Sequence, residues 1–80
     1  ETFKIGKDRN FVDYCISDNK AISRAHAYIL NKNSNYYILD NNSTNHTFVD
    51  GVKITSQKEV ILKNGTKIKL ANEEFEFKIF

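Results

Sequence analysis

Two short polar stretches carry the side chains in this sequence that are best suited to binding an anion. One is Ser23-Arg24-Ala25-His26, and the other is Ser43-Thr44-Asn45-His46-Thr47, which Asp50-Gly51 follows. Both stretches lie in turns between strand-like runs. Side-chain hydroxyls and loop N–H groups can direct several donors at one tetrahedral phosphate, and a nearby cation adds a charge-assisted hydrogen bond. Neither stretch resembles a catalytic or metal-binding motif, so the residue types favour an anion site.

The composition limits the kind of protein that can carry these stretches. With 80 residues, 40 % hydrophobic and 12 % aromatic, the chain can form one small domain whose thin core is filled largely by Phe and Tyr. The net charge is +2, with Lys and Glu interspersed, which gives nucleic-acid binding little support. No apolar run approaches the roughly 20 residues of a membrane span, and the first residues do not match a signal segment. We expect one soluble domain over residues 1–80, cut from a longer protein, with neither nucleic acid nor membrane insertion among its interactions.

The single cysteine, Cys15, restricts the covalent and metal chemistry of the chain. One thiol excludes an internal disulfide, so the chain needs no oxidising compartment. Cys15 lies in the strand-like run Tyr14-Cys15-Ile16, where a core thiol is the expected role. His26, His46 and Cys15 lack the short ligand spacings of zinc sites. We therefore expect neither a metal nor a cofactor.

Alternation with a period of two dominates the sequence between the turns. Phe75, Phe77 and Ile79 alternate with charged residues, which gives one apolar face and one charged face. The runs Ala27-Tyr28-Ile29-Leu30 and Tyr36-Tyr37-Ile38-Leu39 predict more fully buried strands. No window shows sustained helical periodicity. The expected strands are residues 2–5, 14–16, 27–30, 36–39, 47–49, 52–54, 59–62, 67–70 and 74–79.

Turn signals separate these strands at short intervals. They are the polar run from Asn31 to Asn35 and the dipeptides Asp50-Gly51 and Asn64-Gly65, both of which accept the positive φ angles of tight hairpin turns. Many short strands with closely spaced turns indicate an all-β fold, an antiparallel sandwich of two sheets. Ser23 and Arg24 would then lie at one end of the sandwich.

The order of four separated pieces is similar to a known family. Gly6-Lys7, Ser-Arg-x-His at 23–26, Ser-Thr-Asn-x-Thr at 43–47 and Asp50-Gly51 occur in register with the strand pattern between them. Together they resemble the forkhead-associated (FHA) domain, a reader of phosphothreonine in protein partners, and the resemblance covers nearly the whole chain. It implies an FHA sandwich, of the SMAD-FHA-like kind, whose loops at one end form the peptide site. It also implies a monomeric binding module without catalysis, which acts in Ser/Thr-kinase signalling inside the cell, in the cytoplasm or on a membrane-tethered parent protein.

The resemblance assigns the phosphate and peptide contacts to five residues. The Ser23 hydroxyl, the Arg24 backbone N–H and the Thr44 hydroxyl would hold the phosphate, and Lys7 would add positive charge. The Asn45 amide would bond the peptide main chain, because an amide offers both donors and an acceptor. Without the resemblance, the same two stretches are ordinary polar turns with self-bonding side chains.

Five further residues would support or extend this site by the same resemblance. His26 would brace the loops through hydrogen bonds, and Gly6 and Gly51 would support the loop structure. Ala21 and Ile22 would contact the residue three places after the phosphothreonine. Their small apolar surface would favour an aliphatic side chain there.

Two positions, Lys7 and His46, depart from the family pattern, and Asp50 differs from the residue that many members carry. Lys7 stands where the family has Arg, so the charge remains but the planar fork is lost, and we expect phosphate affinity to weaken by about 1 kcal/mol. His46 replaces a Gly. Either its ring is accommodated in a positive-φ turn at some strain, or the ring faces the pocket and strengthens binding below about pH 6.5. Asp50 stands where family members often carry Asn, and it places a negative charge near an anionic ligand.

Two other functions compete with this interpretation. A hydrolase built from Ser23, His26 and Asp40 is disfavoured, because Ser23 and His26 are three positions apart at a strand start, where side chains alternate. A Gly-rich nucleophile turn is also absent from the sequence. The stronger rival is a degenerate FHA-like sandwich that acts as a phosphate-independent protein-interaction scaffold through its sheet face or loops. Lys7, His46 and Asp50 keep this alternative open.

Overall fold

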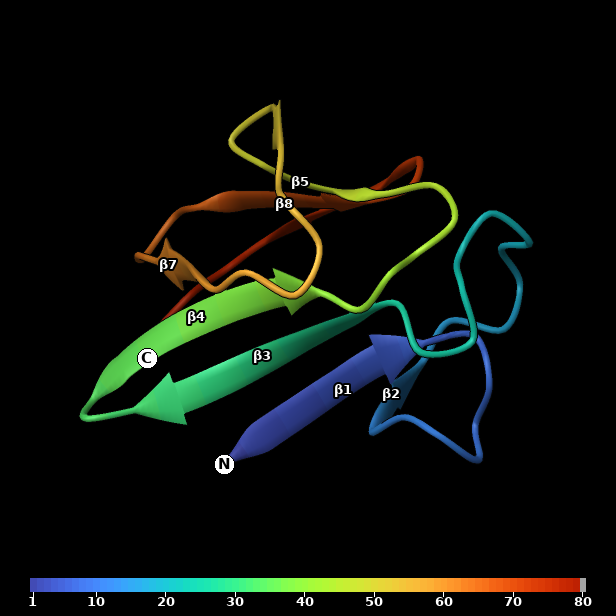
Figure 1. Cartoon of the computed structure of the whole chain (residues 1–80), viewed down its shortest axis with the longest axis horizontal. Helices are drawn as coiled ribbons and strands as arrows, with labels where there is room; N and C mark the ends of the chain where they lie inside the picture. Colours follow the sequence, from blue (N-terminus) through green and yellow to red (C-terminus); the bar gives the residue numbers. More distant parts are fainter. Residues whose placement is uncertain (80) are drawn as a thin grey trace.

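The computed structural model describes residues 1–79 and contains only strands and turns in that range. Five strands form one sheet in the order β2-β1-β3-β4-β7, and four form the other in the order β6-β5-β8-β9. The two sheets are the layers of a sandwich (Figure 1). The strands are β1 (Thr2–Gly6), β2 (Tyr14–Cys15), β3 (Ala27–Lys32), β4 (Asn35–Asp40), β5 (Thr47–Val49), β6 (Val52–Lys53), β7 (Val60–Leu62), β8 (Lys67–Leu70) and β9 (Glu73–Glu76). The all-β, two-sheet sandwich expected from the sequence is confirmed.

The register of the five-stranded sheet gathers apolar side chains on its inner face. Phe3 of β1 pairs with Ile29 of β3, which pairs with Ile38 of β4, which in turn pairs with Val60 of β7. Side chains at paired positions share a face, so these four residues form one row across the sheet. The buried core between the sheets consists of Ile16, Ile22, Ala27, Ile38, Ile54, Leu62, Ile68 and Leu70.

The outer face of the same sheet differs from the expectation for β3 and β4. Their apolar runs predict strands covered on both faces, but only one face is covered. Ala27 and Ile38 are buried, whereas the paired residues Tyr28 and Leu39 on the outer face are only half-buried. The Lys4 ammonium lies 5.6 Å from the centre of the Tyr28 ring and shields it in part.

The pairing of β1 with β2 departs from a purely antiparallel pattern. β2 is two residues long and runs parallel to β1, with Gly6 opposite Cys15. The connection over residues 7–13 returns along β1, and the N–H of Asp13 donates to the carbonyl of Lys4 at 2.9 Å. Parallel neighbours cannot be joined by a tight hairpin, so a return loop takes its place.

Only one of the two expected glycine turns is a hairpin. Asp50 and Gly51 have φ angles of 49° and 83° and join β5 to its antiparallel neighbour β6, as the sequence predicts. Asn64-Gly65, with Gly65 at φ 92°, instead connects β7 in one sheet to β8 in the other. Both dipeptides accept positive φ, so local sequence does not distinguish the two uses.

The last strand ends earlier than the alternation predicts. β9 stops at Glu76. The backbone of Phe77 is hydrogen-bonded to the turn before β8: its N–H donates to the carbonyl of Thr66, and its carbonyl accepts the N–H of Gly65. Ile79 is 50 % exposed. Phe80 lies outside the described residues.

Strand register also brings the two polar stretches to the same end of the sandwich. Ala27, the first residue of β3, pairs with Ile5 near the end of β1 and with Asp40 at the end of β4. The segment before Ala27 and the segments after Ile5 and Asp40 must therefore leave the sheet at the same end of these three strands. These connections lie together at the right of Figure 1, as blue, teal and lime loops.

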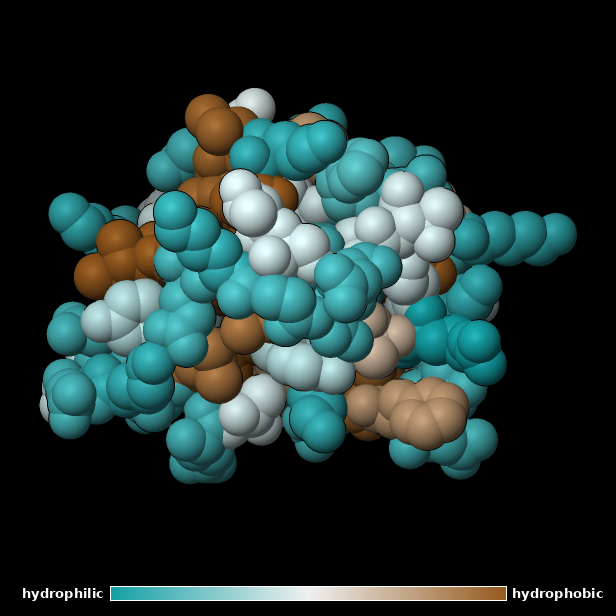
Figure 2. Space-filling model, in the orientation of Figure 1, coloured by the Kyte–Doolittle hydropathy of each residue, from teal (hydrophilic) through white to brown (hydrophobic). Residues whose placement is uncertain are grey.

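The surface seen in Figure 2 is mainly hydrophilic, with hydrophobic residues in small separate patches. Among residues 1–79, no helix is long and apolar enough to cross a membrane.

Candidate functional site

The end of β1 lies directly against the first polar stretch. The N–H groups of Lys7 and Asp8 donate to the carbonyls of Ser23 and Arg24 at 2.9 and 3.1 Å. A Cβ at Gly6 would stand 2.1 Å from the carbonyl oxygen of Arg24. Only glycine permits so close an approach of two backbone segments, so Gly6 allows Lys7 to lie beside Ser23 and Arg24.

Two hydrogen bonds join the β4–β5 loop to the loop between β2 and β3. The Oγ of Ser23 accepts the backbone N–H of Thr44 at 3.0 Å, and the Asn45 side-chain amide donates to the carbonyl of Ala21 at 2.9 Å. Thr44 and Asn45 are exposed, and Ser23 is half-buried. Because the Ser23 oxygen acts as an acceptor in this contact, its hydroxyl proton remains available to a ligand.

His26 lies beneath both loops and connects them. Its Nδ1 accepts the N–H of Ser23 at 3.0 Å, and its Nε2 lies 2.8 Å from the carbonyl oxygen of His46. A carbonyl can only accept, so Nε2 carries the proton and the ring is neutral. The ring is fully buried, and this burial lowers the pKa of His26 by more than the His46 carbonyl and the Asp40 carboxylate raise it.

Asp40 holds the β4–β5 loop from the inside. Its carboxylate, 3 % exposed as a residue, accepts the Ser43 N–H at 3.1 Å, the Ser43 hydroxyl, and the Thr47 hydroxyl at 2.7 Å. Burial alone raises the pKa of a carboxyl group, but these hydrogen bonds together lower the pKa of Asp40 below its ordinary value. Ser43 therefore faces the interior rather than an anion.

This structural role of Asp40 was not predicted from the sequence. An Asp followed three residues later by Ser, at the end of an apolar strand, is typical of a side chain that bonds the backbone of its own turn. That spacing was the available signal. It could have separated the inward-facing Ser43 from the exposed Thr44 next to it.

His46 adopts the left-handed backbone conformation that its position in the loop requires. Its φ is 70°, a region that glycine adopts readily and other residues occupy at a cost of about 1 kcal/mol or more. The His46 carbonyl accepts the N–H of Ala71 at 3.0 Å as well as the proton of His26. The positive-φ turn is thus kept with histidine in place of glycine, and the His46 side chain is exposed.

A comparison with known protein families identifies the family to which this domain belongs. A family model described as FHA domain matches residues 3–71, a span that includes Lys7 and both polar stretches. The chain belongs to the FHA domain family. The family resemblance inferred from the four sequence pieces is therefore confirmed.

Solved FHA structures share the fold of this domain. Mycobacterium tuberculosis EmbR, in complex with a low affinity phosphopeptide, is 33 % identical with a TM-score of 0.87, over 98 % of this chain and 20 % of EmbR. The FHA domain of CT664 from Chlamydia trachomatis is 28 % identical with a TM-score of 0.91, over 100 % of this chain and 77 % of that one. The N-terminal FHA domain of S. cerevisiae Rad53p, in complex with a phosphothreonine peptide, is 26 % identical with a TM-score of 0.78, over 85 % and 54 %. The present chain thus spans a fifth of the EmbR chain. No curated protein sequence matches it significantly.

We call the following residues the loop cluster: Lys7, Ala21, Ser23, Arg24, Thr44 and Asn45, with His26 beneath them. Not every residue expected at the site of this FHA domain lies in it. Ile22 is 1 % exposed and packs in the core, so the expectation that it contacts a ligand is wrong. Asp50 and Gly51 lie at the other end of β5 from His46, and a strand of that length spans about 10 Å. There the Asp50 carboxylate accepts the N–H of Lys67 at 2.9 Å. The structure therefore gives Asp50 and Gly51 a role in the β5–β6 hairpin and does not bring them to the loops.

The loop cluster does not have the geometry of a hydrolase. The Nδ1 of His26 accepts the backbone N–H of Ser23, whereas a catalytic base would accept the hydroxyl proton. The hydroxyls of Ser43 and Thr47 bind Asp40, which does not receive a ring N–H of His26. Within residues 1–79, no group of three or more His, Cys, Asp or Glu side chains is placed to hold a metal ion.

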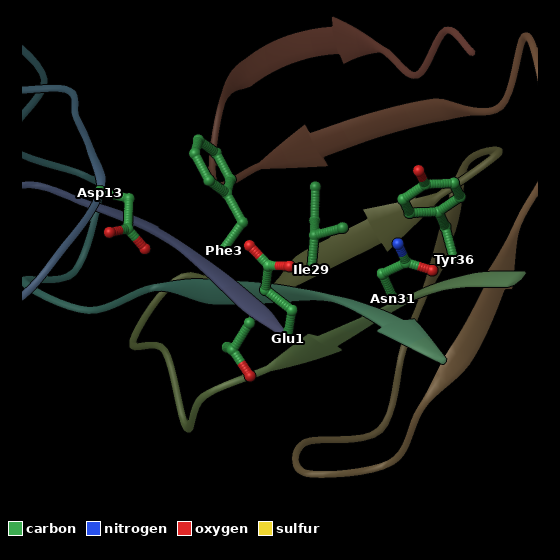
Figure 3. Close-up of a pocket in the computed structure, with 7 residues that line it drawn as sticks. Glu1, Phe3, Asp13, Ile29, Asn31 and Tyr36 are labelled. Carbon is green, nitrogen blue, oxygen red and sulfur yellow. The ribbon is translucent and has the colours of Figure 1, made fainter. Parts of the chain in front are cut away.

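A separate groove of about 380 Å³ lies away from the loop cluster of the FHA domain (Figure 3). Figure 3 shows Phe3, Ile29 and Tyr36 extending from the five-stranded sheet toward the strands of the other sheet. Phe3 remains 46 % exposed, although its position in β1 is on the inner face. The groove is lined by Glu1, Thr2, Phe3, Asp13, Ile29, Asn31 and Tyr36. It includes none of the residues expected to bind phosphate or peptide.

Proposed function

We propose that this FHA domain binds phosphothreonine-containing proteins through the loop cluster at one end of its sandwich. The observation that carries the proposal is the 3.0 Å hydrogen bond from the Thr44 N–H to the Ser23 Oγ. It holds two loops side by side and leaves the Ser23 hydroxyl proton for a phosphate oxygen. Arg24 follows Ser23 directly, and Lys7 is held beside Ser23 by the hydrogen bond from its N–H to the Ser23 carbonyl. Both residues supply positive charge next to this hydroxyl.

The phosphate would be held by converging donors. A phosphothreonine carries a charge of about −1.5 to −2 at neutral pH and three acceptor oxygens. The Ser23 hydroxyl, the Arg24 N–H and the Thr44 hydroxyl donate to those oxygens in this proposal, and the Lys7 ammonium adds a charge-assisted bond. Lysine lacks the bidentate fork of arginine, so the phosphate grip is weaker by about 1 kcal/mol than an arginine would give.

The peptide would cross the loops in an extended conformation. Asn45 is exposed, and its amide donates to the carbonyl of Ala21. Its Oδ1 can accept a peptide N–H, and its second amide proton can donate to a peptide carbonyl. Such contacts hold a main chain without selecting its side chains. Ala21 is half-buried beside this position and offers a small apolar surface to the peptide.

Two of the related structures support the assignment. EmbR, 33 % identical, was solved in complex with a low affinity phosphopeptide, and the Rad53p domain, 26 % identical, in complex with a phosphothreonine peptide. The donor set described above gives the present chain the same kind of ligand chemistry. In this proposal the domain is a monomeric reader inside the cell, in the cytoplasm. A Ser/Thr kinase elsewhere forms the ligand, and this domain performs no catalysis.

The test is a titration with a degenerate phosphothreonine peptide pool and with the same pool unphosphorylated, followed by tyrosine fluorescence or NMR shifts. Ser23→Ala and Asn45→Ala should abolish or strongly weaken binding. Asn35→Ala is the matched control, because Asn35 is exposed at the start of β4, at the opposite end of that strand from Asp40. Phosphate-dependent binding that survives both loop substitutions would place the ligand elsewhere and contradict the proposal.

The groove of Figure 3 favours one alternative function, phosphate-independent protein binding. Its exposed Phe3 and half-buried Ile29 and Tyr36 form apolar surface of the kind that protein partners cover. If the domain binds its partner through this groove, the domain should bind both peptide pools equally or bind neither. Its affinity for the partner should change little with salt, since apolar contacts are not screened. Phe3→Ser would weaken that binding and leave phosphopeptide binding unchanged.

A further inference from the structure

The β4–β5 loop has a second side, and this side borders a cleft. The cleft has a volume of about 460 Å³ and lies between the loop and the segment that includes the end of β6. Asn42 and His46 line it from the loop, and Lys53, Thr55 and Ser56 line it from the opposite segment. None of the residues proposed to contact the phosphate or the peptide main chain lines this cleft.

Hydrogen bonds hold the two walls of the cleft at a fixed spacing. The N–H of Asn42 donates to the Oγ of Ser56 at 2.8 Å, and the N–H of Ile54 donates to the carbonyl of Thr47 at 3.0 Å. Asp40 and Ser56 also form an isolated bridge between the two segments. A ligand would therefore meet a preformed cleft and would lose little free energy in ordering it.

The charges that line the cleft favour an anion. Lys53 is exposed and positively charged, and the exposed His46 ring carries an N–H that can donate a hydrogen bond. Asp40 is the one acid among the described residues that line the cleft, and it is 3 % exposed. Its carboxylate already accepts hydrogen bonds from Ser43 and Thr47.

The cleft lies within reach of a peptide that binds at Thr44. Thr44 and His46 are two positions apart in the same loop, so their Cα atoms are separated by at most about 7 Å. An extended peptide covers that distance with roughly two residues. A side chain roughly two or three residues from the phosphothreonine can therefore enter the cleft.

We propose that the cleft between His46 and Lys53 is a specificity subsite for a second negatively charged group on the bound phosphopeptide. The group is an Asp or Glu carboxylate or a second phosphoryl group, two or three residues from the phosphothreonine. Lys53 attracts the anion, and the His46 ring and the Thr55 hydroxyl donate to it. The inference rests on the proposed phosphothreonine-binding function and adds to it a preference that the phosphate contacts themselves do not supply.

The experiment uses a phosphothreonine peptide in a neutral background. Glu, Gln or phosphoserine is placed in turn at each position from three before to three after the phosphothreonine. Dissociation constants are measured for the wild-type domain and for Lys53→Gln, Lys53→Glu and His46→Gly. Lys63→Gln is the matched control, because Lys63 is an exposed lysine outside the cleft and its substitution removes the same charge.

At one position we expect Glu to bind about three to five times more tightly than Gln, the range of a well-placed exposed charge pair. Phosphoserine at that position should bind more tightly than Glu if its larger charge fits the cleft. The Glu preference should disappear in Lys53→Gln, reverse in Lys53→Glu and decrease in His46→Gly. It should persist in Lys63→Gln.

The outcomes separate the subsite from the function on which it rests. If the phosphothreonine peptide with Gln binds and its unphosphorylated form does not, but Glu is preferred nowhere, the subsite is refuted and the proposed function stands. A Glu preference that is unchanged in Lys53→Gln also refutes the subsite. If no peptide shows phosphate-dependent binding, both proposals are refuted together.

Discussion

His26 and His46 are joined across the loop cluster, with the Nε2–H of His26 donating to the backbone carbonyl of His46 at 2.8 Å. This bond fastens the loop that carries Thr44 and Asn45 to the segment between Ser23 and the start of β3. Since the acceptor is a carbonyl, the side chain at position 46 does not take part in it. The imidazole of His26 and the side chain of His46 therefore have separable roles.

His26→Ala should lower the free energy of unfolding by about 2–4 kcal/mol. The substitution removes a buried ring and leaves the Ser23 N–H and the His46 carbonyl without their partner. It should also weaken phosphopeptide binding, because the two loops lose their common support. Urea denaturation and peptide titration measure the two effects.

His46→Gly is the control for this prediction. It keeps the carbonyl that accepts from His26 and removes the strain of a side chain at φ 70°, so stability should be unchanged or rise by up to about 1 kcal/mol. A His46→Gly protein that is as unstable as His26→Ala would show that the side chain at position 46 holds the loops.

Acidification should destabilise the domain in two separate ranges of pH. The pKa of His26 is lowered from 6.5 by burial, so the unfolded chain binds a proton first. The His26 contribution is complete above about pH 6.5 and is lost as the pH falls below that value toward the folded-state pKa. The pKa of Asp40 is lowered from 3.8 because its hydrogen bonds outweigh its burial, so its contribution is lost only as the pH falls below about 3.8.

Chemical denaturation at a series of pH values from about 8 to about 3 measures both ranges. Asp40→Asn should remove the fall at low pH and keep the fall that begins near 6.5. A protein whose stability does not fall at all between about pH 6.5 and about pH 3.8 would contradict the neutral state assigned to His26.

Gly6→Ala should destabilise the domain by about 1–3 kcal/mol and also weaken phosphopeptide binding. A methyl group there would meet the backbone of Arg24 at 2.1 Å, and backbone cannot move aside as a flexible side chain can. The shift would separate Lys7 from Ser23. Stability and affinity should therefore fall together.

Gly51→Ala is the matched control for Gly6→Ala. Gly51 has a φ of 83° and open space around the added methyl group, so the substitution costs about 1 kcal/mol through backbone strain alone. Because the Asp50-Gly51 turn lies at the far end of β5 from the loops, affinity for a phosphothreonine peptide that carries no second negative charge should not change. Equal losses of affinity in both variants would place this turn in the phosphothreonine site.

Lys7→Arg should raise affinity for a phosphothreonine peptide by about 1 kcal/mol, which is roughly a fivefold lower Kd. The arginine fork can grip two phosphate oxygens where lysine offers a point charge. Lys63→Arg, on an exposed turn, should have no effect. If Lys7→Arg and Lys7→Gln both bind as the wild type does, position 7 makes no contact with the phosphate.

The fold class and the family could be predicted from the amino-acid sequence alone. Alternation along Lys67-Ile68-Lys69-Leu70 and positive-φ dipeptides such as Asp50-Gly51 are local signals, and they predict strands and hairpins without knowledge of distant contacts. Four short pieces in fixed order were enough to identify the FHA family, because their spacing follows the strands between them. Local patterns did not fix the end of β9 or the connection made by Asn64-Gly65, since both depend on which sheet the chain joins next.

Which polar side chains are available to a ligand depends on contacts between distant parts of the chain, and local sequence does not show it. Ser43 and Thr44 are adjacent and chemically alike, yet Ser43 binds the buried Asp40 while Thr44 is exposed and bonded through its N–H to Ser23. Ile22 lies next to Ser23 in sequence and belongs to the core. Which way a side chain faces in an irregular loop depends on its partners across the sandwich. Here those partners are brought together by the register of Ala27 with Ile5 and Asp40, a relation between residues far apart in sequence.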